Sequence, residues 1–317
     1  MSKENNSCQK LLERLVESDE PLKDVWEAFA GIWDEASKKI EKTDECKNYY
    51  SNCEAKADEL ERFLINVNPS IYGVLLGNAE NHLGPRSIFP SSVSEMIVVD
   101  GMSLREFFLL KKDLEEKGYR LKSLQQSFSA VPSETIPFAE RVFGLKRAPS
   151  QLPQTINLGE ENIRYVHVQG ERAYIPLRPD PPFAVWVPLP DDLLKSPRRI
   201  GVTVLYRTTR NVVMRVIEEY SPSRFFLTSD HGYLLSGTTW ELRGEVAESY
   251  RDLFHDARYA DIEVEIPKEL KGTIICGSGR SYLVSRYDWD RKGQKKTGFH
   301  GGISMTEVLT PMAIFER

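Results

Sequence analysis

The stretch SEMIVVDG, residues 94–101, decides the fold class of this 317-residue chain. Its run of four apolar residues shows no alternation, which is typical of a strand buried on both faces of a parallel sheet. The runs FAVWV at 183–187 and FFL at 225–227 repeat this pattern, and helical periodicity lies at 104–117 and 199–220. We therefore predict an α/β fold with a mostly parallel sheet flanked by helices and an N-terminal helical segment.

Further segments complete the predicted sheet and its surroundings. Residues 121–130 and 312–315 are predicted strands. The turn residues QGE at 169–171 separate two β-prone segments, 163–168 and 172–177, and predict an outlying β-hairpin.

Charge and periodicity divide the chain into three parts. Residues 1–66 carry 16 acidic and 10 basic side chains, whereas residues 67–317 carry 31 and 32. An apolar stripe at helical spacing over 25–40 predicts that the acidic segment is helical. Residues 67–91, rich in Gly, Pro and Asn, are a predicted linker with short elements, and residues 92–317 are the predicted catalytic domain. The stripe either packs against the rest of the chain or docks a protein partner.

The composition is that of a globular protein in a reducing compartment. The chain is 40% hydrophobic and 28% charged, and its four cysteines are too few for a disulfide framework. No apolar run approaches the roughly 20 residues that span a bilayer, and no signal-peptide core begins the chain. We expect a cytoplasmic protein without a membrane partner. The net charge of −5 does not exclude a phosphate-rich partner, because residues 280–300 are locally +4, with six basic and two acidic side chains.

Polar residues that follow the apolar runs supply the ligands of a metal site. Asp100 follows the first run, Asp230 and His231 follow the run at 225–227, and His300 lies between glycines. Because sites in open α/β sheets form at the carboxyl ends of strands, we expect these side chains to meet. Carboxylates and imidazoles bind zinc, manganese and related divalent ions. The alternatives are that the strand-end aspartates cap helices and that the loop histidine is solvated.

The segment PSETIP, residues 132–137, places two hydroxyl groups at a predicted helix start. A hydroxyl in this position is commonly an N-cap. The same position lets helix amides and a metal ion lower the pKa of the hydroxyl and stabilise a transferring phosphoryl group. From the residues alone, both roles are open for Ser133 and Thr135.

From about residue 92 to 317 the chain resembles the alkaline phosphatase superfamily and, within it, the PglZ domain family. The most specific pieces are YLV at 282–284 and HGGISMTEVLTP at 300–311, which are similar to the family's closing stretch. The resemblance implies a catalytic nucleophile at Thr135, with Ser133 as the fallback. It also implies that one metal ion is bound by Asp100, Asp230 and His231, and that His300 serves a second ion.

One element departs from the superfamily pattern. The Asp-x-x-x-His element that completes the second metal site corresponds here to DDLLK, residues 191–195. Asp191 or Asp192 can stand for the aspartate, but Lys195 takes the place of the histidine. We therefore expect one or two divalent ions, Zn or Mn, with Asp191 as a ligand. Lys195 is expected to be catalytic by supplying part of the missing positive charge.

These features predict a metal-dependent phosphohydrolase. Reduced metal charge favours a phosphodiester, which carries one negative charge, over a monoester. Basic and aromatic residues alternate over 280–300, which suits a nucleic-acid or nucleotide substrate, although a solvated loop is the alternative. The resemblance implies nuclease or nucleotide phosphodiesterase activity and a role in phage defence. The predicted substrate-binding residues are Ser133, Arg280, Arg286, Lys292 and Lys295.

The rival prediction is a degenerate phosphatase fold that acts as an interaction module. In that case the eroded second metal site would carry no catalysis, and the acidic N-terminal helices would dock a protein partner. The metal content of the protein discriminates between the two functions.

Overall fold

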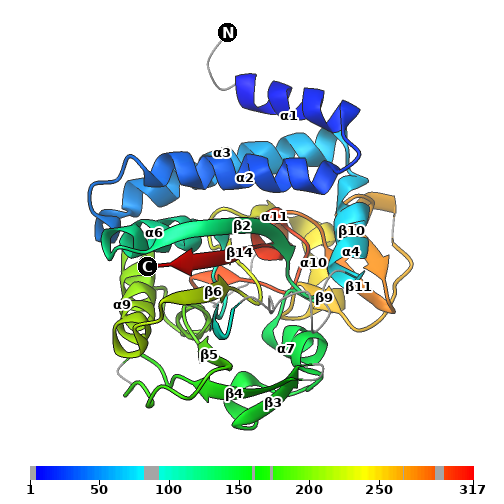
Figure 1. Cartoon of the computed structure of the whole chain (residues 1–317). Helices are drawn as coiled ribbons and strands as arrows, with labels where there is room; N and C mark the ends of the chain where they lie inside the picture. Colours follow the sequence, from blue (N-terminus) through cyan, green and yellow to red (C-terminus); the bar gives the residue numbers. More distant parts are fainter. Residues whose placement is uncertain (1–4, 82–92, 159–160, 172–173, 267, 290–295) are drawn as a thin grey trace.

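A seven-stranded sheet of order β2-β14-β6-β1-β5-β4-β3 forms the centre of the protein (Figure 1). The structure is a computed structural model that describes residues 5–81, 93–158, 161–171, 174–266, 268–289 and 296–317. β1 pairs in parallel with β5 and β6, and β5 pairs in parallel with β4. β14 runs antiparallel to its neighbours β6 and β2, and β3 runs antiparallel to β4. Five of the seven strands therefore point the same way, which confirms the α/β prediction. The strands are β1 (Glu95–Val99), β2 (Arg120–Phe128), β3 (Thr155–Leu158), β4 (Glu161–His167), β5 (Phe183–Val187), β6 (Arg224–Thr228) and β14 (Leu309–Glu316).

Helices cover both faces of this sheet, which explains why its central strands are apolar throughout. On one face, Ile97 and Leu227 join a core with α6 (Leu104–Glu116) and α9 (Val202–Tyr220). On the other face, Trp186 packs against α7 (Thr135–Phe143). Because successive strand residues point to opposite faces, a strand between two helical layers has no solvent-facing side.

The N-terminal segment is helical, as predicted, and its apolar stripe is buried. α2 (Pro21–Ser37) and α3 (Lys47–Val67) lie side by side across the α6 side of the molecule, with α1 (Asn5–Glu17) outside them (Figure 1). Trp26 of the stripe donates a hydrogen bond from Nε1 to the carbonyl oxygen of Thr310 in β14 (3.1 Å). The stripe therefore packs against the rest of the chain, and a partner on the outer surface of these helices stays a prediction. None of the described helices combines the length and apolar character needed to cross a membrane.

The segment predicted as a linker with short elements contains one helix, α4 (Ile71–Asn81), whose apolar face is buried near β10 (Ile274–Gly277); residues 82–92 lie outside the described residues. One local prediction needs correction. The predicted hairpin is different, because β4 pairs with the preceding strand β3 and the described part of 172–177 forms no strand. The turn residues at 169–171 thus end a strand without starting a hairpin.

Smaller elements complete the chain beyond α7. Between β5 and α9 lies the single turn α8 (Asp191–Leu194). The segment after β6 forms a subdomain beside the carboxyl edge of the main sheet. Its elements are β7 (Leu234–Leu235), β8 (Trp240–Leu242), α10 (Gly244–Phe254), β9 (Tyr259–Ala260), β10, β11 (Arg280–Leu283), β12 (Tyr287–Trp289), β13 (Gly298–Phe299) and α11 (Met305–Val308).

A buried network of ion pairs joins α3 to the rest of the chain. Arg286 Nη1 lies 2.8 Å from Glu54 Oε2, and Arg286 Nε lies 3.1 Å from Glu61 Oε1. Arg105 of α6 pairs with the other oxygen of Glu54. Arg286 is fully buried, so the prediction that it binds substrate is wrong. Its charge balances two glutamates that would otherwise be buried without partners.

We predict that Arg286→Met lowers the free energy of unfolding by about 3–5 kcal/mol, because it leaves buried carboxylates without their partner. Arg280→Met is the matched control. Arg280 pairs with the exposed Asp261, so its loss should cost at most about 1 kcal/mol. Urea denaturation followed by circular dichroism measures both values. Equal costs for the two variants would contradict the structural role of Arg286.

Candidate active site

Three carboxylates meet at the carboxyl edge of the main sheet. Asp100 follows β1, Asp230 follows β6 by two residues, and Asp191 opens α8 after β5. The backbone amide of Gly101 donates to Asp230 Oδ1 (2.9 Å), and the amide of Asp191 donates to the carbonyl of Asp100 (3.2 Å). Gly101 has φ +74°, and a Cβ there would lie 3.2 Å from the Cβ of Asp191. A glycine after the first strand thus lets the two loops approach.

Asp100, Asp230 and His231 form the first group of candidate metal ligands, with one ligand atom from each residue within 4.8 Å of the others. Nε2 of His231 lies 3.6 Å from Asp100 Oδ1 and 3.5 Å from Asp230 Oδ2. Nδ1 of His231 lies 2.8 Å from the carbonyl of Gly232, to which it donates its proton, so Nε2 is the ring nitrogen left to face an ion. Trp186 Nε1 donates to Asp100 Oδ2 (3.0 Å) and fixes that carboxylate from behind.

The donor set of the first group fits a divalent cation. Asp230 Oδ2 is buried and receives no hydrogen bond from the part of the chain that the structure describes. Burial raises the pKa of Asp100 well above its ordinary value, and the negative charges of Asp230 and Asp191 raise it further. A cation at the convergence of two carboxylate oxygens and one imidazole nitrogen would relieve both the repulsion and the missing hydrogen bond.

Thr135 places its hydroxyl against this group of ligands. Its Oγ1 donates to Asp100 Oδ1 (3.2 Å) and lies 3.3 Å from Nε2 of His231. Thr135 is the first residue of α7, so free backbone amides of the helix start lie close to its hydroxyl. The carboxylates, the imidazole and the hydroxyl that the sequence singled out are therefore brought together. Their catalytic and metal-binding roles belong to the proposal below.

Asp191, His231 and His300 form the second group of candidate metal ligands, and Lys195 lies beside it. Asp191 Oδ1 lies 3.2 Å from His300 Nε2, and Lys195 Nζ contacts Asp191 Oδ2. Burial alone would favour the neutral acid, but His300 and Lys195 hold the pKa of Asp191 below its ordinary value. For Lys195, burial is outweighed by Asp191, which raises the pKa of the ammonium. The ring of His300 stacks on that of His231, with centroids 4.4 Å apart.

Only one aspartate of the DDLLK segment faces the site. Asp191 is 1% exposed and makes all the contacts described above, whereas Asp192 is exposed. α8 is a single turn, so only one of two consecutive residues can point toward the sheet edge. Four residues after Asp191, Lys195 lies on the same side of this turn.

Ser133 supports the site without entering it. Its side chain is fully buried, and its Oγ donates to the carbonyl of Gly302 (3.0 Å) and accepts from the amide of Gly301 (2.8 Å). The Ser133 carbonyl lies 3.2 Å from Nδ1 of His300. Ser133 therefore holds the loop of His300 and is not a substrate-binding residue, which corrects that prediction.

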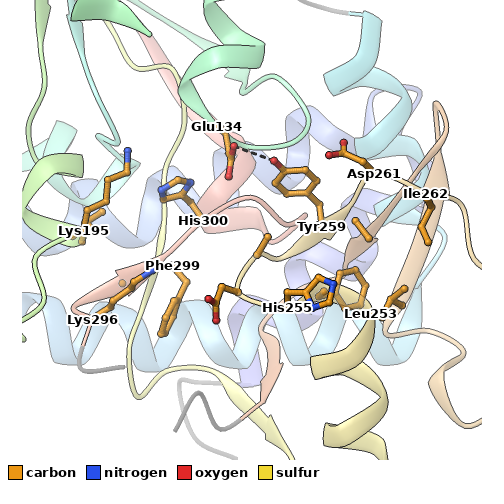
Figure 2. Close-up of a pocket in the computed structure, with 16 residues that line it drawn as sticks. Glu134, Lys195, Leu253, His255, Tyr259, Asp261, Ile262, Lys296, Phe299 and His300 are labelled. Carbon is orange, nitrogen blue, oxygen red and sulfur yellow. Dashed lines mark hydrogen bonds between the residues drawn. The ribbon is translucent and has the colours of Figure 1, made fainter. Parts of the chain in front are cut away.

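His300 and Lys195 line a cavity of about 630 Å³ between the sheet edge and the α10–β9 segment (Figure 2). His300 and Lys195 lie near one end and Tyr259 lies farther along the same wall, with Glu134 accepting a hydrogen bond from Tyr259 OH (3.3 Å). Lys296 and Phe299 line another side. The cavity therefore combines aromatic surface with side chains of both charges: the ammonium groups of Lys195 and Lys296, and the carboxylates of Glu134, Asp256 and Asp261. The remaining lining residues are Leu194, Leu253, Phe254, His255, Asp256, Ala257, Ala260, Asp261, Ile262 and Gly298.

The basic segment 280–300 contributes less to this cavity than the sequence predicted. Arg286 is buried in the α3 network, and Arg280 lies on β11 in its ion pair with Asp261, outside the cavity lining. The predicted substrate-binding residues Lys292 and Lys295 lie outside the described residues. Lys296 is the basic residue of this segment that the structure places at the cavity.

Several residues that shape the site give little signal in the sequence. Trp186 lies within an apolar strand and carries no polar signal in the sequence, yet its indole orients Asp100. His255 belongs to no motif and is expected to be a surface or packing residue, yet it lines the cavity. Tyr259 belongs to no motif. Glu134 is different, because its place directly before the predicted nucleophile Thr135 is a local sequence signal that it lies near the site.

Comparison with known proteins finds a remote structural similarity only. No protein-family model and no curated protein matches the chain. Among solved structures, phosphonoacetate hydrolase from Sinorhizobium meliloti 1021 aligns in complex with phosphonoacetate, at 8% identity and a TM-score of 0.36. The same enzyme in complex with phosphonoformate aligns at 9% identity and the same TM-score. Each alignment covers 70% of this chain and 89% of the other.

We predict that divalent zinc or manganese raises the melting temperature of the protein and that Asp230→Asn abolishes this shift, because the variant removes a ligand of the first group. Saturation at about 100 times the dissociation constant would stabilise the wild type by about 2.7 kcal/mol. Asp192→Asn is the matched control and should keep the full shift, since Asp192 points away. Differential scanning calorimetry measures the shift. An unchanged shift in Asp230→Asn would remove the metal assignment.

Proposed function

We propose that this protein is a metal-dependent phosphohydrolase that cleaves phosphodiesters with Thr135 as the nucleophile. One observation carries the proposal: the Thr135 hydroxyl lies within 3.3 Å of both a carboxylate and an imidazole that converge on a common point at the sheet edge. The resemblance of residues 92–317 to the PglZ domain family and the alkaline phosphatase superfamily supports the same chemistry.

The residues of the site divide the work of an in-line displacement. A divalent ion held by Asp100, Asp230 and His231 would polarise the phosphate and lower the pKa of the Thr135 hydroxyl. Thr135 donates its hydrogen bond to Asp100, which takes the proton while Oγ1 forms the new P–O bond. The bond from phosphorus to one ester oxygen breaks, and that oxygen leaves as an alkoxide or phenolate that takes a proton from water. A second water then attacks the phosphorus on Thr135, releases a phosphomonoester and restores the hydroxyl.

The cavity supports a nucleotide or nucleic-acid diester as the substrate class. Lys195 and Lys296 can contact phosphate oxygens, and Phe299 and Tyr259 offer rings on which a base can stack. Nuclease activity and a role in phage defence are the corresponding proposals for the cellular function. Arg286 gives no support to this substrate class, because its guanidinium is held in the buried ion pairs with Glu54 and Glu61.

Substitution of Thr135 tests the nucleophile. We expect Thr135→Ala to lower kcat for bis(4-nitrophenyl) phosphate on the order of 10³-fold or more, because the covalent route is lost. Thr135→Ser keeps a hydroxyl and should retain measurable turnover. Acid quenching during turnover, followed by mass spectrometry, should show a 4-nitrophenyl phosphoryl group on residue 135 in the wild type, because only one of the two nitrophenolates has left. Undiminished turnover in Thr135→Ala would contradict the mechanism. The rival function, an interaction module, would be supported if the protein bound no metal and the Asp230→Ala variant kept its cellular role.

A panel of nitrophenyl esters tests the substrate class. With zinc or manganese added, we expect a higher kcat/KM for the diester than for 4-nitrophenyl phosphate, because a site poor in positive charge stabilises one substrate charge better than two. The ratio for the Asp192→Asn variant should equal that of the wild type. A clear preference for the monoester would overturn this part of the proposal.

A further inference from the structure

We infer that the site holds a single metal ion and that the ammonium of Lys195 takes the place of a second one. The inference rests on the proposed function for its chemistry, but its argument comes from how the ligand atoms are shared. The two candidate ligand groups, Asp100–Asp230–His231 and Asp191–His231–His300, have His231 in common.

His231 has only one ring nitrogen that can bind a metal ion. Its Nδ1 is used by the carbonyl of Gly232, so Nε2 is the one atom available to an ion. That atom lies close to both carboxylates of the first group and to the Thr135 hydroxyl. Once His231 serves the first group, the second group is reduced to Asp191 and His300. Structural and catalytic zinc sites in proteins keep at least three protein ligands, so two ligands make a weak site.

Lys195 further closes the second group to a cation. Its Nζ contacts Asp191 Oδ2, so one of the two remaining carboxylate oxygens is already paired with a positive charge. An ion bound to Asp191 and His300 would stand next to this ammonium and be repelled by it. The ammonium also lines the cavity beside His300, where a bound phosphate would meet it (Figure 2). Lys195 therefore does by fixed charge what an ion at this place would do.

The geometry of α8 allows one substitution to give the second group a third ligand. Residues 191 and 195 are four apart on one helical turn, and the Lys195 amide donates to the Asp191 carbonyl (3.1 Å). A histidine at 195 would place an imidazole beside Asp191 and bring the second group to three ligands. Lys195→Met is the matched control, since it removes the charge and adds no ligand of comparable affinity.

Metal counting tests the inference without turnover. Protein stripped with a chelator, reloaded with zinc and dialysed should contain one ion per chain in the wild type and in Lys195→Met, and two in Lys195→His, by mass spectrometry of the elements. Circular dichroism and melting temperature confirm that each variant is folded. Two ions in the wild type, or one in a folded Lys195→His, would overturn the inference.

Inorganic phosphate tests the role of the ammonium. Isothermal titration of the zinc-loaded protein with phosphate should show a dissociation constant about 10- to 100-fold higher in Lys195→Met than in the wild type, because one charge-assisted hydrogen bond is lost. An equal constant would show that Lys195 does not face the anion. Neither the metal count nor the phosphate titration depends on hydrolysis. A wild type that cleaves no ester would therefore contradict the proposed function, while the metal count would still decide this inference.

Discussion

The mutual repulsion of three buried carboxylates at one sheet edge is the constraint around which this structure is arranged. Asp100, Asp191 and Asp230 end up together because β1 lies between β5 and β6 and all three strands run in parallel. Each carboxylate is partly neutralised by a different group: the indole of Trp186, the ammonium of Lys195, and backbone amides of the site. Among the described residues Asp230 Oδ2 receives no hydrogen bond, and one ligand atom each of Asp100, Asp230 and His231 lies within 4.8 Å of the others, an arrangement that fits a candidate cation site.

An outer layer of buried charge fixes the loops that carry these ligands. Arg105 pairs with Glu54 of α3 and donates from Nη2 to the carbonyl of Tyr233, two residues beyond His231. Glu307 of α11 accepts from Arg258 and from the amide of Gly302, which lies in the loop of His300. The acidic N-terminal segment is therefore part of the framework of the site. Glu54 and Glu61 look like surface charge in the sequence, but they complete an ion network in the interior.

This contrast shows how far the sequence could predict the molecule. The buried parallel strands could be predicted because a strand covered on both faces needs apolar residues at every position. The polar residues directly after such strands could be predicted as site residues because sites in open α/β sheets form at the carboxyl ends of strands. Arg286 is different: its partners Glu54 and Glu61 lie 232 and 225 residues away, so a count of local charge placed it at the surface. The hairpin failed for a related reason, because strand pairing is decided by which segment lies alongside and not by the turn alone. Likewise, only the three-dimensional turn of α8 distinguishes Asp191 from Asp192.

Charge balance connects these observations to the proposed phosphodiester substrate. When ionised, the three carboxylates carry three negative charges, and one divalent ion bound as proposed would supply, together with the Lys195 ammonium, three positive charges. A site that is neutral at rest has little excess potential with which to hold a dianionic phosphomonoester, since each further charge must be placed near buried carboxylates at low dielectric. A diester brings one charge and two oxygen substituents, and the second substituent needs room. The cavity beyond His300, with aromatic rings on its walls, provides that room on the side where the ammonium stands. Under the proposed function, the ammonium of Lys195 beside Asp191 and the size of the cavity thus favour the same substrate class, although they arise from different segments of the chain.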